Sequence, residues 1–222
     1  MFICFEGIDG AGKSTQARML QQRLRHDGMP NVELVCDPGT TQIGTAIRQI
    51  LLQNDAPISP AAQMLLFSAA RAELASHIKD SLSAGGVVIC DRWLLSTLVY
   101  QGEINNISLD LITHIFRETS CLQPDICFLL DLNPEAAAIR MGRPGDRYER
   151  RCAEDRNRMR TAYLRHAHER AHAKRVHVIS ADQVADETHE QIYGFVRSFL
   201  RDTSGEHKHG CVADFARAAI TR

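Results

Sequence analysis

The segment from Gly7 to Ser14, GIDGAGKS, has glycine at its first and sixth positions, followed directly by lysine and serine. This spacing, G-x-x-x-x-G-K-[ST], is typical of a loop whose backbone N–H groups surround a β-phosphate, with the lysine on the β and γ oxygens and the serine hydroxyl offered to Mg²⁺. The alternative is a glycine-rich turn that merely links a strand to a helix, but every fixed position of the pattern is filled. We therefore predict an ATP-binding loop formed by Gly7, Ile8, Asp9, Gly10, Ala11, Gly12, Lys13, Ser14 and Thr15.

Asp91 and Arg92 follow directly on the apolar run Val87–Cys90. An acidic residue at the end of such a strand is placed to hold the hydration shell of Mg²⁺ beside a phosphate loop. We therefore predict that Ser14 and Asp91 hold Mg²⁺ and that Arg92 lies beside the phosphates. The alternative for Arg92 is a surface ion pair with Asp91 or another acid.

Phe67 and Arg71 stand four residues apart in a helical stretch, so that the ring and the guanidinium lie on one face. An aromatic plane beside a fork of donors suits a nucleobase, which stacks on the ring and offers its carbonyl edge to the donors. The alternative is ordinary packing of a phenylalanine in the core, and taken alone this pair favours packing.

The segment RMGRPGDRYERR, residues 140–151, gathers arginines around a Pro-Gly break between two helical stretches. A basic flap of this kind stabilises charge on a moving phosphoryl group and excludes water. We expect a lid at about 140–155 that carries catalytic Arg143 and Arg147. The alternative, a solvated helix face, is preferred for the later arginines Arg156, Arg158 and Arg165.

These clusters fall just after short apolar runs that read as strands, separated by helical stretches. Near-continuous apolar strands suit a parallel sheet that is covered on both faces, and such sheets bind ligands at the carboxyl ends of their strands. We predict an α/β fold with a doubly wound five-stranded parallel sheet and helices on both faces. The predicted strands are Phe2–Glu6, Val32–Cys36, Val87–Cys90, Ile126–Asp131 and Val176–Ile179, and the predicted helices are Lys13–Asp27, Gln42–Gln53, Pro60–Ser83, Leu109–Ser120, Pro134–Met141, about Glu149–Lys174 and Ala185–Arg201.

The chain has 222 residues, of which 44% are hydrophobic, and a formal net charge of −1. This length suits one domain, which we place at 1–202, and this charge argues against a protein that coats nucleic acid or an anionic membrane. The segment 203–222 is polar, and we expect partial disorder or packing against a neighbour there.

Seven cysteines without a C-x-x-C pair suggest neither a disulfide framework nor a zinc cage. Cys4, Cys36, Cys90 and Cys127 lie in the predicted strands, where a thiol is a small buried hydrophobe. No apolar run approaches the ~18 residues needed to span a bilayer, and we expect a cytoplasmic protein.

Taken together, the motifs resemble those of the thymidylate kinases, which are nucleoside monophosphate kinases of the phosphate-loop class. The resemblance runs from Phe2 to about Phe199 and is most specific in DRWLLSTLVYQG. The matching segments, in the order of the family, are FEGIDGAGKST (5–15), DPGTT (37–41), IRQILL (47–52), LLFSAARAEL (65–74), DRWLLSTLVYQG (91–102), PDICFLLDLNPEAA (124–137) and RPGDRYE (143–149).

The resemblance implies a transfer of the γ-phosphoryl group of ATP to dTMP, giving ADP and dTDP for dTTP synthesis, with ATP and Mg²⁺ as cofactors. The implied catalytic residues are Lys13, Arg92, Arg143 and Arg147. On the acceptor side, Asp9 accepts from the sugar 3′-hydroxyl, Asp37 helps place the acceptor and its metal shell, Arg48 and Arg92 hold the dTMP phosphate, Phe67 stacks on thymine, Arg71 with Ser96 or Thr97 reads its edge, and Tyr100 and Gln101 wall off the sugar.

The family divides by whether its catalytic arginine lies in the phosphate loop or in the lid. Gly10 and Ala11 leave this loop without arginine, so the chain resembles the lid-arginine type that is common in bacteria. It departs from the usual pattern at Thr40, Trp93 and Glu103. Thr40 stands beside the turn at Asp37, and Glu103 adds a negative charge near the acceptor pocket. Family resemblance also implies a homodimer.

Two other functions stay open from the residues alone. A deoxynucleoside kinase shares the loop, the Asp-Arg pair and an arginine lid, but it needs a carboxylate base, for which Asp37 is a candidate. Arg48 and the YQG turn at 100–102 fit a phosphorylated acceptor better. A non-catalytic nucleotide-binding switch protein would not need Lys13, Ser14, Asp91 and the lid arginines together.

Overall fold

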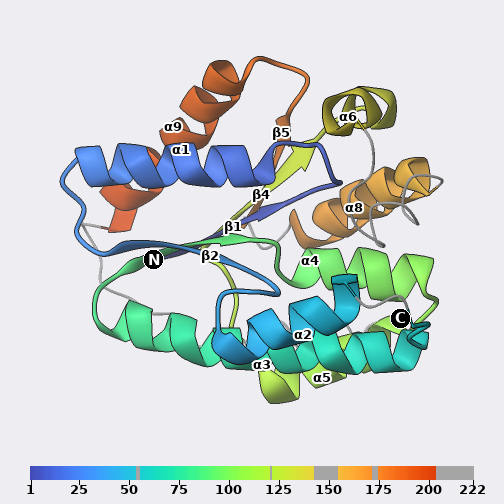
Figure 1. The fold of residues 1–222 in the computed structure, drawn as a ribbon. Coiled ribbons are helices and arrows are strands. Elements are labelled where there is room, and N and C mark those ends of the chain that lie inside the picture. Colours follow the sequence, from blue (N-terminus) through green and yellow to red (C-terminus); the bar gives the residue numbers. More distant parts are fainter. Residues whose placement is uncertain (54–55, 121, 143–154, 172–174, 204–222) are drawn as a thin grey trace.

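The computed structural model describes residues 1–53, 56–120, 122–142, 155–171 and 175–203. The described part is a five-stranded sheet between two layers of helices (Figure 1). The strands are β1 (Phe2–Glu6), β2 (Val32–Cys36), β3 (Val87–Asp91), β4 (Ile126–Asp131) and β5 (Val176–Ser180). The helices are α1 (Lys13–His26), α2 (Gln42–Gln53), α3 (Pro60–Ser83), α4 (Leu94–Thr97), the π-helix η1 (Leu98–Ile104), α5 (Leu109–Thr119), α6 (Pro134–Met141), α8 (Arg156–Ala171) and α9 (Ala185–Thr203).

The sheet has the strand order β2-β3-β1-β4-β5, and every neighbouring pair is parallel. Helices α1 and α9 pack on one face, while α3, α4, η1 and α8 pack on the other. Because both faces are covered, the central strands β1, β3 and β4 are almost fully buried, and all five residues of β1 are buried, whereas the edge strands β2 and β5 are only partly so. The predicted doubly wound parallel sheet is confirmed.

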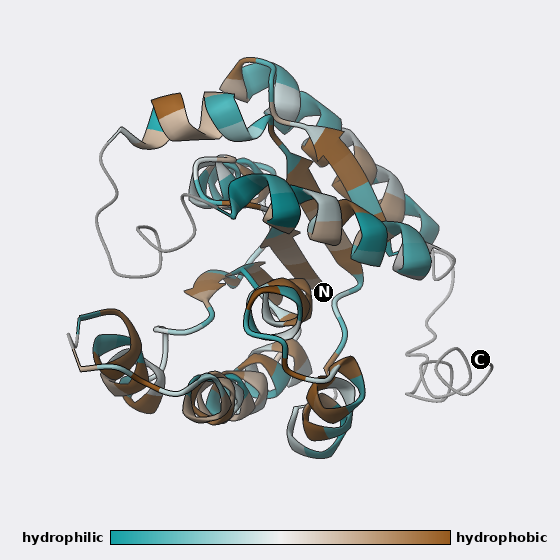
Figure 2. Cartoon of the chain, turned by 90° about the vertical axis from the view of Figure 1, so that its right-hand side faces the viewer, coloured by the Kyte–Doolittle hydropathy of each residue, from teal (hydrophilic) through white to brown (hydrophobic). Residues whose placement is uncertain are grey.

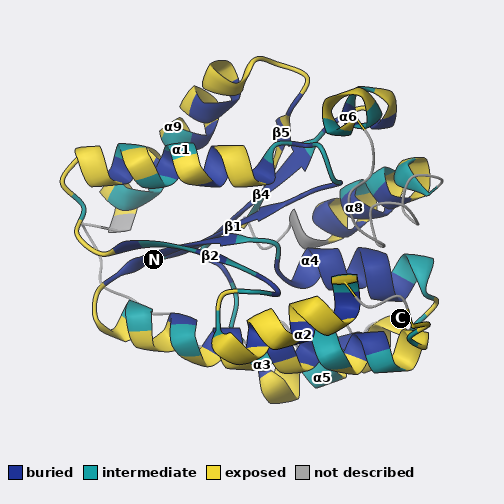
Figure 3. Ribbon diagram, viewed as in Figure 1, coloured by how far each residue is buried: buried dark blue, intermediate teal, exposed yellow. Residues whose placement is uncertain are grey.

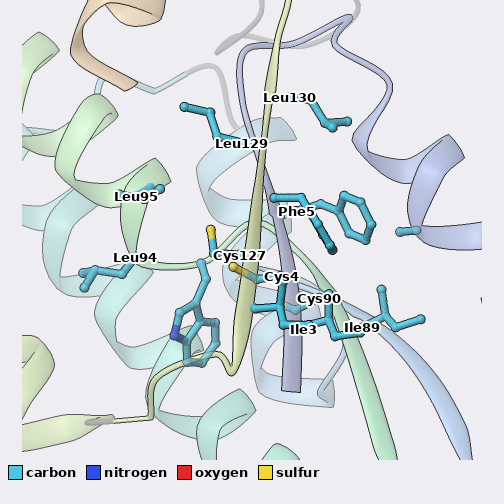
Figure 4. Packing of buried hydrophobic residues seen from close by; sticks show 14 of the residues in the cluster. Ile3, Cys4, Phe5, Ile89, Cys90, Leu94, Leu95, Cys127, Leu129 and Leu130 are labelled. Carbon is cyan, nitrogen blue, oxygen red and sulfur yellow. The ribbon is translucent and has the colours of Figure 1, made fainter. Parts of the chain in front are cut away.

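The core lies along the central strands. Figure 2 shows the hydrophobic strands between helices of mixed polarity, and Figure 3 shows the helices turning their exposed sides outward. In the sheet, Cys4 stands in register between Cys90 and Cys127, with Phe5 on the opposite face of β1 (Figure 4). These three cysteines are buried as predicted, whereas Cys36 is half-buried.

Two helix starts follow directly from local sequence. Ser59 caps α3, because its hydroxyl accepts from Ala62 N at 3.3 Å, and Pro60 occupies the first turn. Asn133 caps α6 in the same way through Glu135 N at 2.8 Å, with Pro134 next. A proline after a capping residue is favoured at this position because its missing N–H has no intrahelical partner there.

The main departure from the sequence prediction is the stretch 94–104. No helix was predicted there and YQG was taken as a turn, but the chain forms α4 followed by the π-helix η1. Val99 and Gly102 are poor helix formers, so packing against α3, α5 and α8 decides the conformation. At Gly102 a Cβ atom would lie 2.6 Å from Leu109 Cδ2, so any larger residue would require the Leu109 side chain on α5 to move.

Smaller differences concern the ends of elements. β3 includes Asp91 and β5 reaches Ser180, each one residue beyond the prediction, and α9 continues to Thr203. Of the arginine-rich helix predicted at about Glu149–Lys174, the described part is α8, which begins at Arg156. Residues 143–154 of the lid predicted at about 140–155, including Arg143 and Arg147, and the segment 204–222 lie outside the described residues. Within the described part, no helix is both long and apolar enough to cross a bilayer.

Candidate active site

The phosphate loop connects β1 to α1 at the carboxyl edge of the sheet. Gly7 has φ 136°, and a Cβ atom there would lie 2.5 Å from Leu130 O, which explains why glycine begins the loop. Lys13 is almost fully buried, and its Nζ donates to Ile8 O at 2.9 Å. Helix α1 begins at Lys13 behind Gly12, and no side chain caps it. Its first N–H groups therefore face the loop, where they favour an anion.

A cleft of about 940 Å³ opens over this edge of the sheet. This volume is at the upper end of the range for small-molecule sites. One wall is the phosphate loop, and the opposite walls come from the ends of β2 and β3 and from the loop between β5 and α9. The lining residues are Asp9, Gly10, Ala11, Gly12, Lys13, Ser14, Thr15, Gln16, Cys36, Asp37, Arg48, Asp91, Arg92, Arg140, Met141, Ala181, Asp182, Gln183, Val184, Ala185 and Thr188.

The two predicted metal ligands meet in this cleft. The Ser14 hydroxyl donates to the Asp91 carboxylate, so the end of β3 lies against the start of α1. A hydroxyl and one carboxylate are hard oxygen donors, and Mg²⁺ at phosphates is held by one or two protein oxygens plus waters and phosphate oxygens. In the described ranges no group of three or more His, Cys, Asp or Glu side chains could hold a metal ion. The donor set therefore fits Mg²⁺ bound together with a nucleotide rather than in a protein cage.

Asp9 lies between two cations and a phenol. Its carboxylate pairs with the Arg92 guanidinium, accepts from the Tyr100 hydroxyl at 3.0 Å, and lies 3.8 Å from Lys13 Nζ. Burial raises the pKa of Asp9, but the charges of Arg92 and Lys13 and the two hydrogen bonds outweigh it and lower the pKa to about 2. Burial and the Arg92 charge lower the pKa of Lys13. The acid that looks misplaced in a phosphate loop is thus a counter-ion that faces the end of β3.

Arg92 is held in an unusual backbone conformation. Its φ is 73°, in the left-handed region that a side chain with a Cβ rarely adopts, and such strain concentrates at functional sites. Its N–H donates to Phe5 O at 2.9 Å, and its guanidinium lies 5.3 Å from the centre of the Tyr100 ring. The Arg92 guanidinium therefore reaches the cleft from a backbone position that is held by a hydrogen bond to β1.

On the β2 side, Asp37 and Arg71 form a buried ion pair with Nε–Oδ2 at 2.6 Å. Burial raises the pKa of Asp37, although Arg71 opposes this rise. The second carboxylate oxygen of Asp37 is buried and makes no hydrogen bond. The Asp37-Pro38 peptide bond is cis, and Arg48 Nη1 donates to Pro38 O at 2.8 Å. This turn brings Asp37 and Arg48 together at the cleft.

Six predicted acceptor residues do not line the cleft: Phe67, Arg71, Ser96, Thr97, Tyr100 and Gln101. Phe67 packs beside the small cluster of Ile47, Leu51 and Ala70, and Gln101 is buried with an unbonded Nε2. The Ser96 hydroxyl already contacts Glu6, Arg92 and Tyr163. Their roles at the base and the sugar stay predictions, and for Ser96 the existing contacts leave little capacity to read a base edge.

The three departures have structural explanations. The Thr40 hydroxyl accepts from Cys36 N at 2.7 Å and closes the turn beside Asp37. Trp93 is buried and its Nε1 donates to Leu122 O at 2.9 Å. Glu103 pairs with Arg165 and with His166 on α8. Its charge is therefore directed at α8.

Sequence reasoning missed two parts of this site. The first is the loop 181–185, which lines the cleft but carries no motif. The second is the pair of buried residues behind Arg92: Tyr163, which accepts from Arg92 Nη1 at 3.3 Å, and Glu6, which is linked to Arg92 through Ser96. A charged residue inside the apolar run FICFE was a signal for Glu6, whereas nothing in the sequence singled out Tyr163.

A phosphate loop on a parallel α/β sheet, with a serine–aspartate hydrogen bond beside the loop and arginines lining the cleft, defines a nucleotide-binding phosphotransferase of the phosphate-loop class. The sequence model of the family described as thymidylate kinase matches residues 5–192. Thymidylate kinase of Symbiobacterium thermophilum is 41% identical over 204 residues, covering 90% of this chain and 94% of the relative.

Two further relatives agree. Thymidylate kinase of Prosthecochloris aestuarii is 42% identical over 205 residues, covering 86% of this chain and 91% of the relative. The crystal structure of thymidylate kinase from Ehrlichia chaffeensis superimposes with a TM-score of 0.70 at 30% identity, covering 88% of this chain and 98% of that one. The chain belongs to the thymidylate kinase family of nucleoside monophosphate kinases, as the sequence motifs predicted.

Proposed function

We propose that this protein transfers the γ-phosphoryl group of ATP to dTMP, giving ADP and dTDP for dTTP synthesis. The observation that carries the proposal is one cleft with two anion-binding walls. The phosphate loop with Lys13 forms one wall, and Arg48 from α2 and Arg92 from the end of β3 line the other. Two phosphorylated ligands fit such a cleft end to end.

On the donor side, residues Gly7 to Thr15 hold the ATP phosphates, and the loop 181–185 receives the rest of the nucleotide. The lining of the cleft by residues 9–15 of the loop and by residues 181–185 supports this arrangement, whereas Gly7 and Ile8 do not line it. Ser14 and Asp91 would hold Mg²⁺, which when bound would neutralise charge on the ATP phosphates.

On the acceptor side, Arg48 and Arg92 hold the dTMP phosphate. Asp9 orients the sugar, and Asp37, at the turn after β2, helps to place the acceptor. Phe67 and Arg71 hold the base, with Ser96 or Thr97 at its edge and with Tyr100 and Gln101 beside the sugar. The position of Tyr100 against Asp9 supports this assignment, because both then meet the acceptor sugar together.

The chemistry needs no general base, because a phosphate monoester oxygen is already a nucleophile at neutral pH. The protein contributes positioning and charge: Lys13 and Arg92 at the loop, and Arg143 and Arg147 from the lid. The absence of arginine in the loop supports the lid-arginine type. Arg147→Ala should therefore lower kcat far more than it raises KM for dTMP. A changed KM with an unchanged kcat would contradict this role of the lid.

The test of the function is an ADP-release assay with ATP across dTMP, dUMP, UMP, CMP, AMP and GMP, with thymidine as a further acceptor. We expect dTMP to give the highest kcat/KM. Preference for thymidine would instead indicate a deoxynucleoside kinase with Asp37 as base. ATP binding without turnover of any acceptor would indicate a non-catalytic switch protein.

We also propose that residues 1–202 form one domain and that the protein works as a cytoplasmic homodimer. Exposed apolar side chains on α2 and α3 support the dimer: Ile43, Ile50 and Leu65 are 51%, 44% and 60% exposed. Sedimentation equilibrium of the purified protein would test the oligomeric state, and a mass of one chain at micromolar concentration would contradict it.

A further inference from the structure

The guanidinium of Arg92 is surrounded by oxygen atoms of four residues. Its Nη1 donates to Ser96 Oγ at 3.1 Å, to Tyr163 Oη at 3.3 Å and to Gly7 O at 3.3 Å. Its Nη2 pairs with Asp9. Arginine side chains have many rotamers, so contacts on several sides are needed to keep one of them.

Behind these contacts lies a buried carboxylate at the end of β1. Glu6 is fully buried and accepts three hydrogen bonds, from Trp93 N at 2.9 Å, from Ser96 N at 3.2 Å and from Ser96 Oγ at 2.6 Å. Helix α4 starts at Leu94, and the side chain before it makes no cap hydrogen bond. The Glu6 carboxylate, at the end of β1, therefore caps the N-terminus of α4, which is the positive end of the helix.

The hydroxyl of Tyr163 completes the cluster from α8. Tyr163 is 1% exposed, and its Oη lies 2.9 Å from Ser96 Oγ. A serine hydroxyl has one proton, and Ser96 donates it to Glu6. The Tyr163 proton must then point to Ser96, which leaves the Tyr163 oxygen to accept from Arg92. The hydrogen bonds therefore run in one order: Arg92 donates to Tyr163, Tyr163 donates to Ser96, and Ser96 donates to Glu6.

We propose that Glu6, Ser96 and Tyr163 are positioning residues that fix the guanidinium of Arg92 for phosphoryl transfer, and this proposal rests on the proposed function. None of the three lines the cleft, whereas Arg92 does. Glu6 and Tyr163 act through Arg92 alone: Glu6 fixes the backbone after it, and the Tyr163 hydroxyl, together with that of Ser96, fixes its Nη1. A displacement of about 1 Å at such a group can cost on the order of a hundredfold in rate.

The central test is Tyr163→Phe, which removes one oxygen and keeps the buried ring. The matched control is Tyr193→Phe on α9, whose hydroxyl donates to exposed Asp27 at 2.7 Å and lies outside the site. We expect Tyr163→Phe to lower kcat/KM for dTMP about tenfold, as loss of a hydrogen bond to a charged group does, with KM for ATP within about twofold. The control should stay within about twofold of wild type.

A double-mutant cycle separates positioning from general stability. If Tyr163 acts through Arg92, adding Tyr163→Phe to Arg92→Ala should change kcat/KM by less than about twofold. An unchanged activity of Tyr163→Phe, or the same tenfold loss in the Arg92→Ala background, would overturn the proposal. Glu6→Gln offers a second variant, since an amide nitrogen cannot accept from Ser96, and it should cause a loss of similar size that is also absent without Arg92.

A spectroscopic readout keeps the result independent of turnover. In ¹⁵N NMR the two Nη signals of Arg92, identified by their loss in Arg92→Ala, should be separate in wild type and in Tyr193→Phe and merged by faster rotation in Tyr163→Phe. Separate signals in Tyr163→Phe would count against the cluster. If the wild-type protein does not phosphorylate dTMP, the proposed function fails, and these spectra still decide whether the three residues hold Arg92.

Discussion

Replacing Asp9 by asparagine should destabilise the protein strongly at pH 7 and only weakly near pH 2. In the wild-type protein the carboxylate faces Arg92, Lys13 and the Tyr100 hydroxyl, and its side chain is 24% exposed. Asparagine keeps the shape but removes the carboxylate that pairs with both cations. The same variant should raise KM for dTMP, because Asp9 is proposed to bind the acceptor sugar.

The magnitude follows from proton linkage. Burial raises the pKa of Asp9, but the cations and hydrogen bonds lower it from 3.8 to about 2 in the folded protein. A lowered folded-state pKa gives stability that is present above the unfolded pKa and is lost as the pH falls through the folded one. The shift corresponds to about 2.5 kcal/mol at pH 7, to roughly half of that at pH 3 and to about 0.4 kcal/mol at pH 2.

The assay is urea unfolding of wild type and Asp9→Asn at pH 7, 5 and 3. The difference in the free energy of unfolding should be constant between pH 7 and pH 5 and should shrink at pH 3. Asp80→Asn, at an exposed position of α3, is the matched control and should change the free energy of unfolding by less than about 0.5 kcal/mol. A pH-independent difference, or an Asp9→Asn protein as stable as wild type at pH 7, would refute the electrostatic account.

Two other substitutions test separate parts of the structure. Trp93→Phe should lower the free energy of unfolding by about 2–3 kcal/mol, because it removes the Nε1 bond to Leu122 O and leaves space between Phe2 and Phe116. Urea titration would measure this, and a loss below about 0.5 kcal/mol would show that the ring is not tightly packed. Ser14→Ala should lower kcat at limiting Mg²⁺ and be partly rescued by excess Mg²⁺, because it removes one proposed metal ligand. A loss that excess Mg²⁺ leaves unchanged would contradict that role.

Much of the fold was predictable because the signals were local. The strands are short apolar runs, and the caps of α3 and α6 are pairs of adjacent residues, Ser59-Pro60 and Asn133-Pro134. The phosphate loop was predictable because glycine spacing reports backbone geometry directly. The contact between Ser14 and Asp91 was predictable because the carboxyl ends of parallel strands lie at the same edge of the sheet.

The rest depended on contacts between distant segments. Tyr163 and Arg92 are 71 residues apart, and their hydrogen bond depends on how α8 packs against α4 and the sheet. The conformation of η1 is likewise set by its neighbours, against the propensity of Val99 and Gly102. For Ser96 the sequence indicated a polar site residue, but only the structure shows that its hydroxyl points to Glu6.

The π-helix η1 makes the length of this segment as important as its residue types. A π turn contains about one residue more than an α turn, so η1 holds a residue that a regular helix would not accommodate. If the segment kept all its residues but formed a regular α-helix, the side chains that follow would be rotated by roughly 100° relative to those that precede it. The π geometry therefore lets Tyr100 reach Asp9 and Glu103 reach α8 from one continuous helical segment. A related chain that lacks one residue between 98 and 104 should form an ordinary α-helix there and keep the elements on either side in place.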